Sequence, residues 1–197
     1  MVRSRPPRRI GIFGGTFDPP HIGHLVAATD AREALDLDVV LLVVAHRPWQ
    51  KQGTRDITSS DDRLAMVEAA VADTPGLEAS DLEIRRGGTT YSVDTLEELR
   101  RGEPDAELFL LVGADAAAGF GTWERPDDVA RLARLVVVDR PGAHGEPDPR
   151  WPWMRVDVPD LEISSTDLRR RFAEGRSVQH LVPAPVAAYA EGRGLYR

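Results

Sequence analysis

Residues Arg9–His24, which read RIGIFGGTFDPPHIGH, contain the pattern that decides the fold. The apolar run Arg9–Gly14 predicts a buried strand, and an apolar stripe within residues 25–35 predicts a helix directly after it. Gly14 and Gly15 lie between the two, where they let backbone N–H groups approach an anion that the helix dipole also attracts. The stretch therefore predicts an α/β fold with a phosphate site at the end of its first strand.

The rest of the chain alternates strand-like and helix-like segments, as parallel α/β proteins do. Asp38–Ala45 (DVVLLVVA) is nearly all apolar, which is typical of a strand covered on both faces. Further strands are predicted within Leu77–Ile84 and over Glu107–Gly113, Leu135–Asp139 and Met154–Val158. Helices are predicted over Asp61–Ala72, Val93–Arg101, Ser165–Glu174 and Pro185–Glu191, with a short helical stretch between Gly113 and Leu135 and a loop over Pro141–Pro152. We predict a doubly wound parallel sheet, Rossmann-like, with a helical C-terminal part and with ligands at the C-terminal strand ends.

Length and composition limit the class of protein. The 197 residues suit one domain, so we expect a single domain over 9–197 behind a flexible arm at 1–8. The absence of cysteine excludes disulfides and thiolate chemistry and fits a reducing cytoplasm. No apolar run reaches the roughly 20 residues that cross a bilayer. With 25 basic and 32 acidic residues the formal charge is −7, which disfavours nucleic-acid binding through many phosphate contacts. We expect a cytoplasmic protein with a local site for a small anion, and neither a membrane nor a nucleic acid as partner.

Two histidines in the first motif suggest the chemistry. His21 and His24 lie three residues apart, so both can face one ligand from a helix start. Beside a phosphate they can donate hydrogen bonds to non-bridging oxygens and to a leaving pyrophosphate, and phosphoryl-type transfer needs little more than positioning and charge stabilisation. Such a pair by itself is more often an ordinary surface or core feature, and the glycine loop around it is what favours a nucleotide site. The loop lacks G-x-G-x-x-G, no G-K-[ST] occurs, and no further residues complete a zinc site.

A second candidate site lies in Ile163–Arg171 (ISSTDLRRR). Its hydroxyl residues can cap a helix and also offer hydroxyls and N–H groups to an anion. Arg169 lies one turn further on and could reach the same anion. By itself this pattern is more typical of a plain helix cap followed by a solvated basic face.

The first motif resembles the nucleotidyltransferase signature G-x-F-D-x-x-H-x-G-H, and the second resembles the I-S-S-T-x-[IL]-R signature of the same superfamily. Together they resemble bacterial nicotinate-nucleotide adenylyltransferases from Ile10 to Tyr196. The resemblance implies an enzyme that joins the AMP part of ATP to nicotinate mononucleotide, giving deamido-NAD and pyrophosphate, with Mg²⁺ bound mainly through the ATP phosphates. The implied ATP-binding residues are Gly14, Gly15, Thr16, Phe17, His21, His24, Gly113, Asp115, Ser164, Ser165, Thr166 and Arg169. The implied catalytic residues are His21, His24, Lys51 and Arg169.

Segments between the signatures imply the acceptor site. Gly87–Leu96 (GGTTYSVDTL) is similar to the family's G-x-[ST]-Y-[ST]-x-D-T, in which the residue at Ser92 helps to bind the nicotinate carboxylate. Phe109–Asp115 followed by Trp123 resembles a segment in which the aspartate meets the ATP ribose and the tryptophan stacks on the pyridine ring. Without the resemblance, a helix cap and a core or surface aromatic are equally good readings of Ser92 and Trp123. The implied acceptor-binding residues are Asp18, Lys51, Ser92, Trp123, Glu124 and Arg140.

The resemblance also implies two loops of the acceptor site, and the segment before the first of them departs from the family pattern. Arg47–Lys51 looks like the family loop whose lysine contacts phosphate, and Val138–Gly142 resembles the strand end that places Arg140 near the site. Val44-Ala45-His46 stands where the family commonly has proline and then a small or polar residue, which leaves acceptor affinity open. The same chemistry on nicotinamide mononucleotide or another phosphate-bearing acceptor, a non-catalytic nucleotide-binding module, and a homo-oligomer all remain alternatives.

Overall fold

The computed structural model describes residues 6–47, 57–139 and 145–197. Its six strands form one parallel sheet in the order β3-β2-β1-β4-β5-β6. The strands are β1 (Arg9–Gly15), β2 (Val39–Val44), β3 (Leu77–Ser80), β4 (Glu107–Gly113), β5 (Arg134–Asp139) and β6 (Trp153–Asp157). The described helices are α1 (Ile22–Ala34), α2 (Ser60–Val71), α3 (Leu82–Arg86), α4 (Ser92–Gly102), α5 (Ala114–Ala118), the 3₁₀ helix η2 (Phe120–Thr122), α6 (Pro126–Leu132), α7 (Ser165–Ala173) and α8 (Ala184–Gly192). The prediction of a doubly wound parallel sheet is confirmed.

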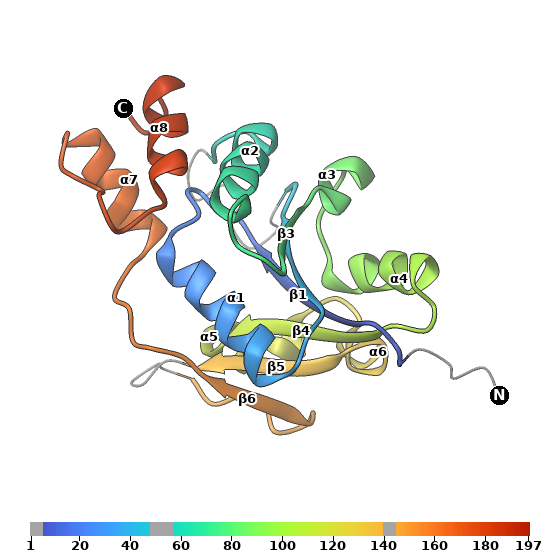
Figure 1. Cartoon of the computed structure of the whole chain (residues 1–197). Coiled ribbons are helices and arrows are strands. Elements are labelled where there is room, and N and C mark those ends of the chain that lie inside the picture. The colour runs from blue at the N-terminus through green and yellow to red at the C-terminus, as the bar shows by residue number, and fades with distance from the viewer. Residues whose placement is uncertain (1–5, 48–56, 140–144) are drawn as a thin grey trace.

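Helices cover both faces of the sheet (Figure 1). On one face, Ala28 and Ala31 of α1 and Val67 of α2 share a buried cluster with β2. On the other face, α4, α5 and α6 contribute to a second cluster, to which α4 brings Val93 and Leu96. The central strands are therefore buried from both sides, which explains why β1, β2, β4 and β5 are continuous apolar runs in the sequence.

The order of the strands places a crevice in the middle of the sheet. From β1 the chain winds through β2 to the edge strand β3, and then crosses back to β4 and winds the other way to β6. In the register, Ile10 of β1 lies between Val39 of β2 and Leu108 of β4. The loops after β1 and β4 diverge because the chain reverses its direction across the sheet there, and ligands of such folds bind at this switch point.

The C-terminal part is helical, as predicted. Figure 1 shows α7 and α8 together at one end of the molecule, next to α2. Met66 and Ala70 of α2 join Leu168 of α7 and Val186 of α8 in a third buried cluster. The C-terminal part also reaches the start of α1, where the Ile22 backbone N–H donates to the Leu181 carbonyl at 3.0 Å. This contact fixes the connection between α7 and α8 against the start of α1.

The short strand expected within Leu77–Ile84 is confirmed as Leu77–Ser80, and it ends there because Asp81 turns the chain into α3 by accepting Arg85 hydrogen bonds at its backbone and side-chain oxygens. The structure differs from the prediction in one segment. The single helical stretch expected before Leu135 is divided into α5, η2 and α6. Gly119 ends α5, and a proline at the first position of α6 starts a new helix.

The described parts of the predicted N-terminal arm and of the predicted loop over Pro141–Pro152 contain no helix or strand. Residues 6–8 are exposed and belong to no helix or strand, and residues 145–152 likewise carry neither. Among the described residues, no helix is long and apolar enough to cross a bilayer.

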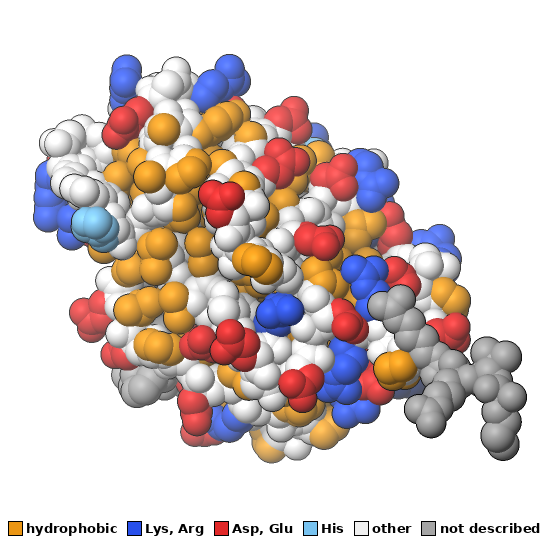
Figure 2. All heavy atoms as spheres, in the orientation of Figure 1, with side chains coloured by type: hydrophobic (Ala, Val, Ile, Leu, Met, Phe, Trp, Pro, Cys, Tyr) orange, Lys and Arg blue, Asp and Glu red, His pale blue; other side chains and the backbone are white. Residues whose placement is uncertain are grey.

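Figure 2 shows acidic and basic side chains interspersed over the face in view, with hydrophobic side chains gathered over α1 and α8.

Candidate functional site

Two neighbouring cavities open at the C-terminal ends of β1 and β4, and both include Phe13 and Gly113 in their walls. The first, of about 280 Å³, is here named the Trp123 cavity. Its walls include Gly14, Gly15, Thr16, Ala45, Glu83, Thr90, Tyr91, Ser92, Ala116, Trp123 and Glu124. The second, of about 600 Å³, is named the His24 cavity. Its walls include His21, Gly23, His24, Val138, Val158, Ile163, Ser164, Ser165, Thr166 and Arg169.

The loop between β1 and α1 forms the partition between the cavities. Phe17 is buried with φ of +51°, and the Asp18–Pro19 peptide bond is cis. A Cβ atom at Gly15 would lie 2.7 Å from the Phe17 ring, so only glycine allows the ring to fold back against the strand end. The predicted glycine-rich turn thus keeps backbone, rather than side chains, at the bottom of the crevice.

The two histidines meet at the start of α1. His21 is the N-cap residue, and its backbone N–H donates to Nδ1 of His24 at 3.1 Å. The two imidazole rings are stacked with centroids 3.7 Å apart, and the Phe17 ring meets His24 edge-on at 5.1 Å. Because Nδ1 of His24 accepts this hydrogen bond, the neutral ring carries its proton on Nε2 and is a donor there. A donor of this kind at the N-terminus of a 13-residue helix favours an anion.

The start of α7 binds the same loop. Oγ of Ser165 donates to the Pro19 carbonyl at 2.9 Å, and a guanidinium nitrogen of Arg169 donates to the Asp18 carbonyl at 2.7 Å. Ser164 caps α7 by accepting the Asp167 N–H at 3.1 Å. The two motifs, nearly 150 residues apart in sequence, therefore form one wall of the His24 cavity.

Asp18 lines neither cavity. Its side chain is 1% exposed and accepts a hydrogen bond from the Tyr196 hydroxyl at 2.8 Å. Burial, and then the Asp18 carboxylate, raise the pKa of Tyr196, so this hydroxyl stays protonated and donates. Asp18 thus holds the C-terminal residues against the β1–α1 loop, a contact that the sequence did not indicate.

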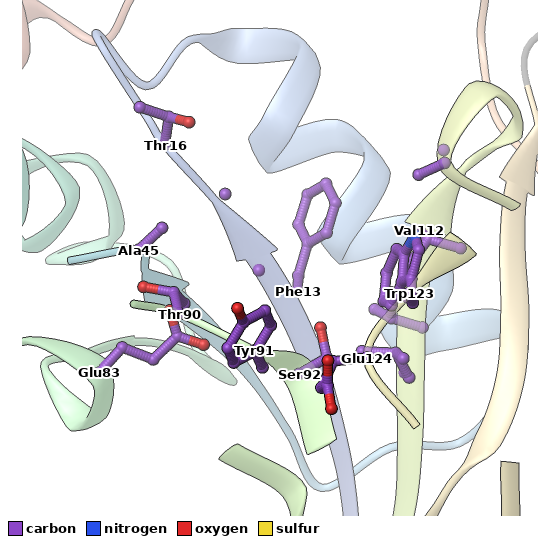
Figure 3. Close-up of a pocket in the computed structure, with 16 residues that line it drawn as sticks. Phe13, Thr16, Ala45, Glu83, Thr90, Tyr91, Ser92, Val112, Trp123 and Glu124 are labelled. Carbon is purple, nitrogen blue, oxygen red and sulfur yellow. The ribbon is translucent and has the colours of Figure 1, made fainter. Parts of the chain in front are cut away.

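The Trp123 cavity brings the predicted acceptor segments together. Ser92 is the first residue of α4, and Trp123 directly follows η2. The Trp123 ring lies against Phe120, with centroids 5.2 Å apart, and Phe120 is itself enclosed by the rings of Trp151 and Trp153. This aromatic cluster orients Trp123 into the cavity, opposite Glu83 and Thr90 (Figure 3).

Glu83 is a cavity residue that the sequence analysis missed. It is 6% exposed, and Oγ1 of Thr95 donates to its carboxylate at 2.6 Å. Burial raises the pKa of Glu83 to about 7, although Thr95 and Arg86 favour the charged form. A single glutamate beside an apolar residue carries no local signal of this kind, because the fold alone removes it from water.

The other predicted residues fall into three groups. Thr16 and Glu124 line the Trp123 cavity, as Thr166 lines the His24 cavity. Asp115 is exposed in the first turn of α5, beside Gly113, and lines neither cavity. Lys51 and Arg140 lie outside the described residues.

The polar side chains that line the His24 cavity are those of histidine, serine, threonine and arginine, which carry N–H and O–H donors rather than carboxylates. Within residues 6–47, 57–139 and 145–197 no three His, Asp or Glu side chains gather as metal ligands. Such a wall suits anionic oxygens, and a cation there would have to arrive with its own oxygen ligands.

Comparison with known proteins identifies related chains. The cytidylyltransferase-like family matches residues 12–171. A Thermus thermophilus protein named a probable nicotinate-nucleotide adenylyltransferase is 48% identical over 189 residues, covering 96% of this chain and 100% of that protein. A protein of the same name from Mycolicibacterium vanbaalenii is 42% identical over 205 residues, covering 98% and 94%. The solved structure of Plasmodium falciparum nicotinic acid mononucleotide adenylyltransferase complexed with NaAD has a TM-score of 0.79 at 17% identity, covering 96% of this chain and 97% of that one, and therefore shares the fold.

Proposed function

Because the chain belongs to the cytidylyltransferase-like family, and within it to the nicotinate-nucleotide adenylyltransferases, we propose that it transfers the AMP part of ATP to nicotinate mononucleotide. The products are deamido-NAD and pyrophosphate. The observation that carries the proposal is the pair of cavities that meet at Phe13 and Gly113, with donors for a triphosphate in one and an aromatic wall in the other. Two substrates seated in them would meet at the switch point of the sheet.

ATP occupies the His24 cavity in this proposal. Its triphosphate faces His21, His24 and the N-terminus of α7, where Ser164, Ser165, Thr166 and Arg169 line the same cavity. Gly14, Gly15 and Phe17 shape the loop beneath it, and Asp115 is proposed for the ribose. Such donors act on charge that develops during transfer, which is the main source of catalysis when the protein supplies no nucleophile.

Nicotinate mononucleotide occupies the Trp123 cavity. Its pyridine ring stacks on Trp123, and its carboxylate meets Ser92 and the backbone N–H groups around Trp123 and Glu124. Lys51 and Arg140 are proposed for the acceptor phosphate on the strength of the sequence resemblance. Asp18 contributes by holding the shape of the loop through Tyr196.

The reaction needs only alignment and charge stabilisation. An oxygen of the acceptor 5′-phosphate forms a bond to the α-phosphorus of ATP in line with the departing group. The bond from that phosphorus to the bridging oxygen of the β-phosphate breaks, and its electron pair leaves with pyrophosphate. Holding both substrates in register is worth several powers of ten in rate. Nε2–H of His24, with His21 beside it, stabilises the α-phosphate and the departing oxygens.

We propose Mg²⁺ as the cofactor, held mainly through the phosphates of ATP. When bound with ATP, Mg²⁺ would neutralise part of the triphosphate charge, and it would need few ligands from the protein. The N–H and O–H donors of the His24 cavity fit this arrangement, because they can bind those phosphate oxygens that Mg²⁺ would not occupy. We also propose the cytoplasm as the compartment, since the reaction draws on ATP and the chain has no cysteine.

The test is pyrophosphate release with ATP and Mg²⁺, comparing nicotinate mononucleotide with nicotinamide mononucleotide. A strong preference for the acid is the expected result. Equal or reversed preference contradicts the carboxylate pocket at Ser92 and Trp123 while leaving adenylyl transfer intact. Absence of release with both acceptors, from protein that binds ATP, contradicts the proposed function and favours a non-catalytic nucleotide-binding module.

A further inference from the structure

Arg63 is a charged side chain at the centre of the fold that the proposed reaction does not use. It lies in the first turn of α2 and is 1% exposed. Its guanidinium donates hydrogen bonds to three backbone carbonyls: that of Thr16 at 2.8 Å, that of Thr58 at 2.9 Å and that of His46 at 3.2 Å. Three segments of the chain thus converge on one side chain.

Two of the three carbonyls, those of Thr16 and His46, belong to segments that border the Trp123 cavity. Thr16 lies in the β1–α1 loop and lines the cavity. His46 follows β2, one residue after Ala45, which also lines the cavity. The next residue, Arg47, exchanges hydrogen bonds with Thr90, because its N–H donates to Thr90 Oγ1 at 3.2 Å and its carbonyl accepts the Thr90 N–H at 3.4 Å. A continuous chain of contacts therefore runs from Thr16 through Arg63 to Thr90.

The geometry of the guanidinium makes this contact rigid. Arginine presents five N–H donors in one plane with fixed directions, and it stays charged when buried. Carbonyls that bind to different nitrogens of the same plane cannot move independently. Lysine or an apolar side chain could fill much of the volume, but neither could fix three acceptors relative to one another.

We propose that Arg63 is a positioning residue that sets the spacing between the β1–α1 loop at Thr16, which leads on to the two histidines of the His24 cavity, and the side of the Trp123 cavity formed at His46 and Thr90. It acts through the backbone and touches no substrate. The inference rests on the proposed function, because that function places the ATP phosphates at the far end of this loop, beside His21 and His24, and the acceptor in the Trp123 cavity. A misplacement of about 1 Å between reacting groups can cost about 100-fold in rate, so the spacing controls turnover more than binding.

A matched control is available at the other end of the sheet. Arg100, near the C-terminus of α4, also donates to three carbonyls, those of Pro104, Ala106 and Leu132, at 3.1, 2.6 and 3.0 Å. It borders neither cavity. Arg100→Met therefore removes the same kind of hydrogen bonds without disturbing the crevice.

The experiment compares Arg63→Met, Arg63→Lys and Arg100→Met with the unaltered chain, at a temperature at which each is folded. Both methionine variants are expected to lower the melting temperature. Arg63→Met alone is expected to lower kcat by about 100-fold with less than about threefold change in substrate dissociation constants, and Arg63→Lys to restore part of it. A kcat for Arg63→Met within twofold of that of Arg100→Met overturns the proposal. If Arg63→Met does not fold, the same criterion applies to Arg63→Lys, for which a drop of about tenfold is expected.

A second readout separates this inference from the reaction itself. Amide hydrogen exchange of residues 14–21 is expected to become faster in the Arg63 variants and to stay unchanged in Arg100→Met. An unaltered chain that does not transfer AMP would contradict the proposed function, and the exchange measurement would still decide the role of Arg63. Unchanged exchange of this loop in every folded Arg63 variant overturns the inference.

Discussion

Replacing Glu83 with glutamine removes a buried carboxyl whose pKa the fold raises from its usual 4.5 to about 7. Burial is the main cause, and Asp94 acts in the same direction, whereas the Thr95 hydroxyl and the Arg86 guanidinium favour the charged form. The folded protein therefore keeps the Glu83 carboxyl mostly protonated up to about pH 7, while in the unfolded chain the same carboxyl ionises near pH 4.5. Its contribution to stability is fully present below pH 4.5 and is lost as the pH rises to 7.

The size of the effect follows from the two pKa values. At about 1.4 kcal/mol for each tenfold change in proton affinity, the difference corresponds to about 3 kcal/mol. About 2 kcal/mol of this loss falls between pH 5 and pH 8, because the unfolded chain is already partly ionised at pH 5. Glutamine keeps the shape and cannot ionise, so Glu83→Gln gains stability relative to the unaltered chain over this range.

Urea unfolding of both proteins at several pH values from 5 to 8 measures the effect. The difference between their free energies of unfolding removes the titration of groups that both share. We expect this difference to change by about 2 kcal/mol in favour of Glu83→Gln as the pH rises. Thr95→Val, which removes a hydrogen bond that favours the carboxylate, should move the fall in stability to higher pH. A difference that stays constant within about 0.5 kcal/mol would refute a raised pKa at this site.

Three further substitutions probe the site directly. His24→Ala removes a transition-state donor and should lower kcat at least ~100-fold in steady-state pyrophosphate release, so near-normal turnover by folded protein contradicts its role. Trp123→Ala removes the stacking surface and should raise the KM for nicotinate mononucleotide about 10- to 100-fold while leaving the KM for ATP nearly unchanged, since base–aromatic stacking is worth about 1–3 kcal/mol. Tyr196→Phe leaves the buried Asp18 carboxylate without its phenol donor and should cost about 1–3 kcal/mol in urea unfolding; an unchanged midpoint shows that the hydrogen bond contributes nothing.

The amino-acid sequence by itself determined the layers of this protein and the location of its loop motif. Strands buried on both faces are visible as apolar runs such as Asp38–Ala45, because each of their residues has to avoid water. The turn after β1 could also be predicted, since the Phe17 ring packs so closely that only glycine fits at Gly15. The exact end of β3 could not be predicted, because an edge strand next to a short helix has too few residues to show a clear hydrophobic periodicity.

The tertiary structure alone decided which distant polar groups meet in the interior around the site. Arg63 and Thr16 are 47 residues apart, and Tyr196 and Asp18 are 178 apart, so no local pattern connects them. The same holds for the raised pKa of Glu83, which arises from the burial that its neighbours impose. The physical reason is that propensity and periodicity act over a few residues, whereas desolvation and hydrogen bonding in the core depend on which distant segments the fold brings together.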